Sequence, residues 1–332
     1  MVGVGQDMLR SPDDALIRVE NLVVEFPAPG GARLQAVSDV SFDVMEGETL
    51  GIVGESGCGK STTAKAVIQM PRPTTGRVAY KDTDLTQLDK EQLRATRTDL
   101  QMIFQDPISS LNPRRSIWDI ISEGVEIWGT SGAWGEARLV ELIESVGIDP
   151  QYRDRKPFQF SGGQCQRISI ARALALDPRV LICDEPVSAL DVSVQAQILN
   201  LLDDLKTEHD LTMLFISHDL AVVRNVSDRV MVMYLGRVAE VGDADSLFDN
   251  PAHPYTQALL AAVPGSDIDA DASLSGELPS PLDPPTGCRF NTRCPHATEV
   301  CMTTIPEFTQ HGPDHWLACH HPQSTAVAIS TS

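Results

Sequence analysis

Hydrophobic and polar positions alternate along two N-terminal stretches and then give way to short, continuous apolar runs. The stretches IRVENLVVEF (17–26) and AVSDVSFDV (36–44) show the period of two that is typical of half-buried strands, and PAPGGA between them has the composition of a turn. Four later runs have the length of buried strands: TLGIVG (49–54), DLQMIFQ (99–105), RVLICD (179–184) and TMLFIS (212–217). Helical patterns separate these runs, so we predict an α/β fold with a largely parallel sheet.

A long interval in the middle of the chain lacks strand patterns. Between about residues 107 and 160, SIWDIISEGVEIW and EARLVELIESVGI carry apolar residues at helical spacing, which predicts a helical insertion in the sheet domain. The stretch HPYTQALLAAVP (253–264) is predicted to form the last helix of this domain. Residues 265–287 are rich in Pro, Ser, Asp and Gly, as is typical of a linker.

The net charge of the chain excludes some classes of binding partner. The 332 residues carry a net charge of −20, which argues against direct binding to nucleic acid or to an anionic membrane surface. The N-terminal stretch lacks a basic start followed by an apolar run, and no segment approaches the roughly 18 apolar residues of a membrane span. We therefore expect a soluble cytoplasmic chain that reaches a membrane only through protein partners.

The octapeptide GESGCGKS (54–61) is the first segment along the chain that indicates a binding site. It fits G-x-x-x-x-G-K-[ST] between a predicted strand and a predicted helix, which is the context that this phosphate-binding motif requires. Its glycines let the backbone N–H groups point at phosphate oxygens, Lys60 can reach the β- and γ-phosphates, and Ser61 can ligate Mg²⁺. The predicted nucleotide-binding residues here are Gly54, Glu55, Ser56, Gly57, Cys58, Gly59, Lys60, Ser61 and Thr62.

A pair of acids follows the buried run RVLICD and completes this chemistry. Asp184 ends the predicted strand and can hold Mg²⁺ through water. Glu185 follows directly, where it can polarise an attacking water as a general base. The two motifs together predict a site that binds phosphate groups with Mg²⁺ and activates a water for their hydrolysis.

Several further segments, in this order along the chain, resemble the motifs of ATP-binding-cassette ATPases. The resemblance covers nearly the whole chain and rests on MIFQDP, FSGGQCQRISIARAL, SALD and FISHD. It implies a P-loop cassette with an antiparallel β subdomain, and it assigns roles to Phe26 (adenine stacking), Gln105 (contact with Mg²⁺ and the attacking water), Ser161, Gly162, Gly163 and Gln164 (signature segment), Asp191 (D-loop) and His218 (γ-phosphate contact).

The same resemblance implies that two such domains pair head to tail. Each ATP would then lie between the phosphate loop of one domain and the signature segment of the other, where Ser161 would contact the γ-phosphate. Catalysis would rest on Glu185, Gln105 and His218, with Ser61, Gln105 and Asp184 around Mg²⁺.

One branch of the family is especially similar, the ATPase subunits of oligopeptide and dipeptide importers, and Cys165 in SGGQCQR is similar to the F-type subunit. That likeness implies a D-type partner ATPase, two membrane permeases and an extracytoplasmic peptide-binding protein, at the cytoplasmic face of the membrane. Nickel or glutathione as cargo, and a soluble non-transport cassette protein, are the alternatives.

Four of the seven cysteines lie near the C-terminus with the spacing C-x5-C-x6-C-x17-C. This spacing differs from the C-x2-C pairs of common zinc modules, but four thiolates suit an iron–sulfur cluster or zinc. Free thiols are the remaining interpretation. The stretch GCRFNTRCPHA resembles the C-terminal extension of peptide-importer ATPases, some of which hold a [4Fe-4S] cluster, and this implies a cluster on Cys288, Cys294, Cys301 and Cys319.

We therefore predict three parts. They are a nucleotide-binding domain at 1–264, a linker at 265–287 and a small cysteine-rich, metal-binding extension at 288–332. Because a linker separates the extension from the domain, ATP binding by residues 1–264 is expected to be independent of the extension.

Overall fold

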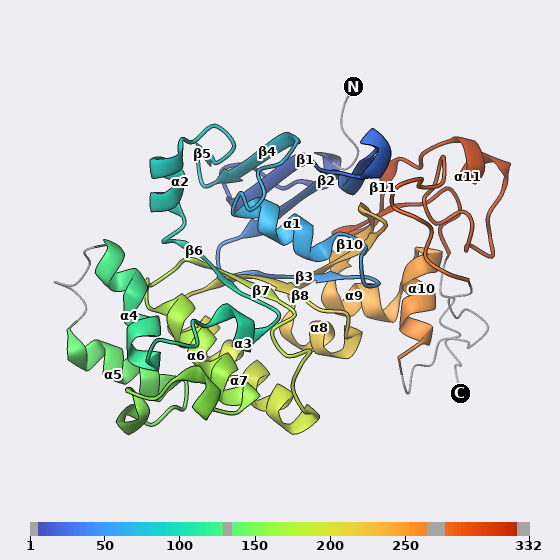
Figure 1. Ribbon diagram of the computed structural model, residues 1–332. Helices are drawn as coiled ribbons and strands as arrows, with labels where there is room; N and C mark the ends of the chain where they lie inside the picture. Colours follow the sequence, from blue (N-terminus) through green and yellow to red (C-terminus); the bar gives the residue numbers. More distant parts are fainter. Residues whose placement is uncertain (1–5, 129–134, 264–275, 324–332) are drawn as a thin grey trace, which may run out of the picture. The chain divides into compact units, whose positions relative to one another are not determined.

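The computed structural model describes residues 6–128, 135–263 and 276–323 (Figure 1). The chain divides into two compact units. The first unit comprises Met1–Gln87 together with Ser217–Ser332, and the second unit comprises Leu88–Ile216. Residues 265–275 of the predicted linker lie outside the described residues.

The first unit contains an antiparallel sheet in the order β2-β1-β4-β5. Its strands are β1 (Ala15–Pro27), β2 (Arg33–Met45), β4 (Thr75–Tyr80) and β5 (Thr83–Asp84). The alternation seen in the sequence places Ile17 and Val19 in the core without exposure, and Val19 lies opposite Phe42 across the β1–β2 pair. The two predicted N-terminal strands and their turn are confirmed.

A second sheet of the first unit has the order β11-β12-β10-β9-β3. The strands are β3 (Thr49–Val53), β9 (Arg229–Tyr234), β10 (Arg237–Asp243), β11 (Phe308–Gly312) and β12 (His315–Ala318). Only the β3–β9 pair is parallel among the pairs described for this sheet. The last two strands come from the cysteine-rich segment, so this segment extends a sheet of the first unit (Figure 1).

Short helices accompany these two sheets. They are α1 (Lys60–Val67), α8 (Leu220–Val226), α9 (Ala244–Asp249), α10 (Pro254–Ala261) and α11 (Glu299–Thr303). The helix predicted at 253–264 is therefore confirmed as α10. Its N-cap is His253, whose Nδ1 accepts from the backbone N–H of Tyr255 at 3.0 Å.

The second unit is built on three parallel strands in the order β8-β7-β6. They are β6 (Leu100–Ile103), β7 (Val180–Asp184) and β8 (Thr212–Ile216), and the last two are buried along their whole length. The unit also contains α2 (Lys90–Thr96), α3 (Pro107–Ser110), α4 (Ile117–Trp128), α5 (Glu136–Ser145), α6 (Gly162–Leu174) and α7 (Val192–Glu208). The predicted α/β class is thus confirmed.

Only helices, turns and irregular chain occur among the described residues between β6 and α6. In α4 the buried residues are Ile117, Ile120, Ile121, Ser122 and Val125, which share one helical face. The apolar spacing of the sequence thus marks the side of this helix that packs, and α4 packs against α6.

Candidate nucleotide-binding site

The phosphate loop, residues 54–61, joins β3 to α1. Gly54 has φ +147° and Gly59 has φ +105°, backbone conformations that favour glycine. Space also excludes a side chain, since a Cβ on Gly54 would lie 2.2 Å from the carbonyl oxygen of Met233, and one on Gly59 would lie 2.3 Å from that of Ala36. The glycines of the motif therefore serve both the curl of the loop and its close packing.

Lys60 begins α1 and is only 4% exposed. Its Nζ donates to the carbonyl oxygens of Gly54 at 2.7 Å and Glu55 at 3.0 Å, so the ammonium lies inside the loop that it is predicted to serve. Cys58 is also buried, and burial raises the pKa of its thiol. A buried neutral thiol fits the predicted role, in which Cys58 contributes its backbone. Ser61 and Thr62 are half-buried in the first turn of α1.

In the second unit, the predicted catalytic carboxylate has a defined partner. Asp184 ends β7 at 1% exposure, and Glu185 follows with φ +49°. The backbone N–H of Glu185 donates to the carbonyl oxygen of Ile216 at 3.0 Å. Nε2 of Gln105 donates to Oε2 of Glu185 at 2.9 Å, so two residues separated by 80 positions meet at the carboxyl ends of the strands.

The predicted signature segment begins a helix of the same unit. Ser161 is the N-cap of α6, where its Oγ accepts from the backbone N–H of Gln164 and Oε1 of Gln164 accepts from the N–H of Ser161. This reciprocal pair is a capping box, which fixes the start of the helix. Ser161 and Gln164 are exposed, Gly162 and Gly163 are half-buried, and Cys165 is packed inside at 1% exposure. Asp191 is exposed at the N-cap of α7.

Two further predicted residues lie in the first unit. His218 is exposed directly before α8, whose N-cap Asp219 accepts from the N–H groups of Ala221 and Val222. Phe26 is half-buried near the end of β1, opposite Leu34. Within the units, the structure therefore brings Gln105 to Glu185 and gathers residues 54–61 around Lys60.

The structure also reveals contacts that the motifs do not indicate. In the cysteine-rich segment, Arg293 forms an ion pair with Glu55 of the phosphate loop. Phe290 is 2% exposed and packs on Tyr234, Tyr255 and His253. No local pattern identifies these partners, because each contact joins residues far apart along the chain.

The buried carboxylate of Glu240 makes a second contact with the cysteine-rich segment. Glu240 on β10 has no exposure, accepts from the backbone N–H groups of Ala252 and His253, and lies 2.7 Å from Nε2 of His315 on β12. Residues 288–318 thus contact the strands and the phosphate loop of the first unit, while the independence of ATP binding by residues 1–264 stays a prediction.

The four tail thiols lie close enough to affect one another electrostatically. Burial, and to a smaller extent neighbouring tail cysteines, raise the pKa of Cys288, Cys294 and Cys319, the last to about 12. Nevertheless, among the described residues no group of three or more His, Cys, Asp or Glu side chains is arranged to hold a metal ion. The described residues therefore do not show the predicted metal centre.

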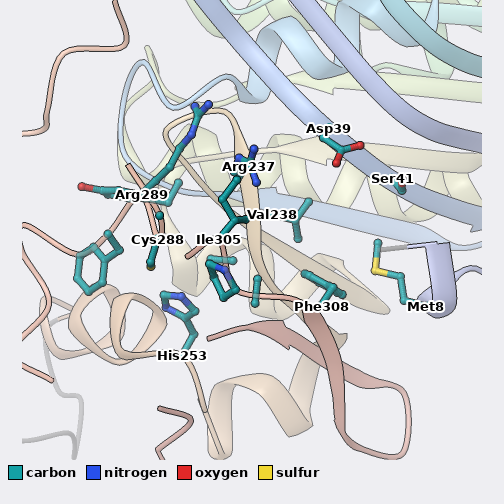
Figure 2. A pocket seen from close by; sticks show the side chains of 16 residues that line it. Met8, Asp39, Ser41, Arg237, Val238, His253, Cys288, Arg289, Ile305 and Phe308 are labelled. Atoms are coloured by element: carbon teal, nitrogen blue, oxygen red, sulfur yellow. The ribbon is translucent and has the colours of Figure 1, made fainter. Parts of the chain in front are cut away.

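Cys288 also lines a cavity of about 40 Å³. Figure 2 shows Arg237 and Arg289 in its wall, together with His253 from the start of α10. Burial lowers the pKa of both arginines, that of Arg289 to about 10, and the charge of Arg237 lowers it further. Two cations thus line the same cavity as Cys288.

Two family descriptions match the chain. The family "ABC transporter" matches residues 37–188, and "Oligopeptide/dipeptide transporter, C-terminal region" matches residues 239–301. Among the described helices, none is both long and apolar enough to cross a bilayer.

Relatives of known name cover almost the entire chain. It is 48% identical over 327 residues to the oligopeptide transport ATP-binding protein AppF of Bacillus subtilis, covering 94% of this chain and 99% of that protein. It is 49% identical over 306 residues to the oligopeptide transport ATP-binding protein OppF of Escherichia coli, and this match covers 88% of this chain and 92% of that protein. A solved structure of the ATP-binding cassette MJ0796 bound to ADP and Pi superimposes with a TM-score of 0.63 at 29% identity, over 69% of this chain and 98% of that one. The chain therefore belongs to the ATPases of the ABC transporter family, in its oligopeptide/dipeptide transporter branch.

Proposed function

We propose that this ATPase powers the uptake of oligopeptides or dipeptides through a membrane complex, from the cytoplasmic face. The observation that carries the proposal is its likeness to oligopeptide transport ATP-binding proteins, which extends through the C-terminal region. Nickel and glutathione remain alternative cargoes, because an ATPase subunit does not touch the cargo.

The ATP phosphates would bind to the loop of residues 54–61. Backbone N–H groups of the loop and the start of α1 would face the phosphate oxygens, and Lys60 would add its charge. Ser61, Asp184 and Gln105 would hold Mg²⁺, which supplies charge neutralisation when bound. Their hydroxyl, carboxylate and amide oxygens are the donors that this ion prefers. Phe26 would stack on the adenine.

Glu185 would act as the general base. Its carboxylate accepts a hydrogen bond from Gln105, which would orient it to receive a proton from the attacking water. The positive φ of Glu185 is a strained conformation that its backbone bond to Ile216 retains. His218 would contact the γ-phosphate.

Hydrolysis would also need a second ATPase of the D type. The exposed cap residues Ser161 and Gln164 and the D-loop residue Asp191 are accessible to such a partner. The helix start at Gly162–Gly163 would add N–H donors to a γ-phosphate held by the partner. Two permeases and a peptide-binding protein complete the proposed complex, and helices within 107–160 are the proposed contact with the permeases.

A [4Fe-4S] cluster on Cys288, Cys294, Cys301 and Cys319 is the proposed metal centre. Cys288, Cys294 and Cys319 each lie within electrostatic range of other tail cysteines, and four such thiolates would supply the ligands that an iron–sulfur cluster requires. The buried guanidinium groups of Arg237 and Arg289 line the same cavity as Cys288 and supply positive charge there. Nε of Arg237 has no hydrogen-bond partner, and Arg289 donates to the neutral oxygens of Leu235, Gln35 and Ser38. Zinc is the alternative metal.

Reconstitution in lipid vesicles tests the proposed transport. The chain alone should hydrolyse ATP poorly, and turnover should rise when the partner ATPase and permeases are present and again with peptide-loaded binding protein. Equal turnover by the dilute monomer and the full complex would reject the need for a partner. Stimulation by nickel- or glutathione-loaded binding protein, and not by peptide, would reassign the cargo.

A further inference from the structure

Glu55, the second residue of the phosphate loop, is held at each of its polar groups. Its backbone N–H donates to the hydroxyl of Tyr255 at 2.9 Å. Its carbonyl oxygen accepts from Nζ of Lys60 at 3.0 Å and from the N–H of Cys58 at 3.2 Å. Its carboxylate pairs with Arg293. The conformation of the loop at this residue is therefore determined from outside the loop as well as within it.

The pair between Arg293 and Glu55 is bidentate. Nη1 lies 2.6 Å from Oε2 and Nη2 lies 3.1 Å from Oε1. The Arg293 side chain is only 5% exposed and that of Glu55 is 25% exposed, so the pair is shielded from water and stronger than a surface pair. The bonds to Glu55 raise the pKa of Arg293. The pair therefore holds both oxygens of the Glu55 carboxylate.

An aromatic cluster supports the same contact. The rings of Tyr234 and Tyr255 lie 4.6 Å apart, and Phe290 packs 5.2 Å and 5.3 Å from them. Tyr255 is completely buried, and its hydroxyl is the acceptor for the N–H of Glu55. The cysteine-rich segment therefore reaches Glu55 twice, directly through Arg293 and through the packing of Phe290 on Tyr255.

We propose that Arg293 is a positioning residue for nucleotide binding. By holding the Glu55 carboxylate, it fixes the start of the phosphate loop in the conformation whose N–H groups receive phosphate. The cysteine-rich segment thereby becomes part of the nucleotide site, and nucleotide in turn strengthens the docking of the segment, because coupling between two equilibria is reciprocal. The proposal rests on the ATPase function and does not depend on the metal.

Titration of the full chain with a fluorescent ATP analogue and Mg²⁺ tests the proposal. Arg293→Met should weaken nucleotide binding about tenfold, within the range of coupling between directly contacting residues, and Arg293→Lys should lie between it and the unmodified chain. Glu55→Gln should cause a similar loss, and the double variant should lose no more than either single one. Arg33→Met, which removes the exposed pair with Glu25 in the same unit, is the matched control and should bind normally.

The outcomes separate this proposal from the proposed function. An unmodified chain that does not bind ATP would overturn the ATPase assignment itself. Normal binding by Arg293→Met and Arg293→Lys, or losses that add in the double variant with Glu55→Gln, would overturn the positioning role. If Arg293→Met fails to fold, the nucleotide affinities of Arg293→Lys and Glu55→Gln decide. Weaker binding by both variants would support the positioning role, and normal binding by both would overturn it.

A second measurement follows the docking of the cysteine-rich segment in the unmodified chain by its susceptibility to proteolysis. Saturating ATP should slow proteolysis within residues 288–318 severalfold, and Glu55→Gln should reduce that protection. Equal cleavage with and without ATP would contradict the coupling.

Discussion

Nε2 of Gln105 and Oε2 of Glu185 lie 2.9 Å apart, and this hydrogen bond joins the second residue after β6 to the first residue after β7. It ties the residue proposed to contact Mg²⁺ and the attacking water to the proposed general base. The bond thus gives a structural basis for the catalytic roles proposed for both residues.

Glu185→Gln should retain nucleotide affinity and reduce ATP turnover by about 10² or more, because the amide cannot accept the proton of the attacking water. Steady-state hydrolysis by the assembled complex, with a parallel binding titration, measures both quantities. Turnover at the normal rate would show that another group is the base.

Lys60→Ala should do the opposite and weaken nucleotide binding itself, since it removes the charge that faces the β- and γ-phosphates. Lys65→Ala, on the same helix beyond the motif, is the matched control. Unchanged affinity in Lys60→Ala would contradict the assignment of residues 54–61 as the phosphate loop.

Gly54→Ala should damage the loop far more than Gly57→Ala. The new Cβ of Gly54→Ala would meet the carbonyl oxygen of Met233 at 2.2 Å at φ +147°, whereas Gly57 has φ +79° and no atom within 4 Å of the added carbon. Steric overlap and backbone strain predict a loss of about 3 kcal/mol in the free energy of unfolding for Gly54→Ala, and strain alone predicts about 1 kcal/mol for Gly57→Ala. Urea unfolding measures the difference, and equal losses would contradict the packing described for this loop.

The chain should lose stability in mild acid through His253. Burial lowers the pKa of His253 to about 4, while the charge of Glu240 opposes the shift. The unfolded chain, with a histidine pKa near 6.5, therefore binds more protons between about pH 6.5 and 4, so this contribution is complete above pH 6.5 and is lost as pH falls through that window. The loss amounts to about 3 kcal/mol in the free energy of unfolding.

His253→Asn tests this origin, because asparagine also caps helices and does not titrate. Urea unfolding from pH 4 to pH 7 should show a flatter dependence in this variant, and His209→Asn serves as the control. A slope that persists in His253→Asn would assign the acid sensitivity to another group.

Anaerobic preparation should yield a brown protein with about four irons and four sulfides per chain. Serine at Cys288, Cys294, Cys301 or Cys319 should remove the visible absorption, whereas serine at the buried Cys58, Cys165 or Cys183 should leave it. Removal of the metal should loosen residues 288–318, since so short a segment gains folding energy from its ligands. One zinc in a colourless protein would replace the cluster, and an ordered, metal-free segment would reject both metals.

Much of this molecule is determined by short-range sequence. The alternation at 17–26 predicts β1, and the octapeptide 54–61 predicts the loop between β3 and α1, because both depend on the conformations of consecutive residues. Asp184 and Glu185 are likewise recognisable together, since they are adjacent at the end of a buried strand.

Only the tertiary structure decided the contacts of the cysteine-rich segment. Glu55 and Arg293 are separated by 238 positions, and a chain with 26 basic and 46 acidic side chains offers no local sign of which two will pair. The linker composition of residues 265–287 led to the prediction of an independent appendage. Such a composition indicates how stiff a segment is, but it does not indicate where the segment that follows it will pack. Docking is decided by the burial of Phe290 against Tyr255 and by the pairing of β12 with β10, and these contacts form only when distant parts of the chain are folded together.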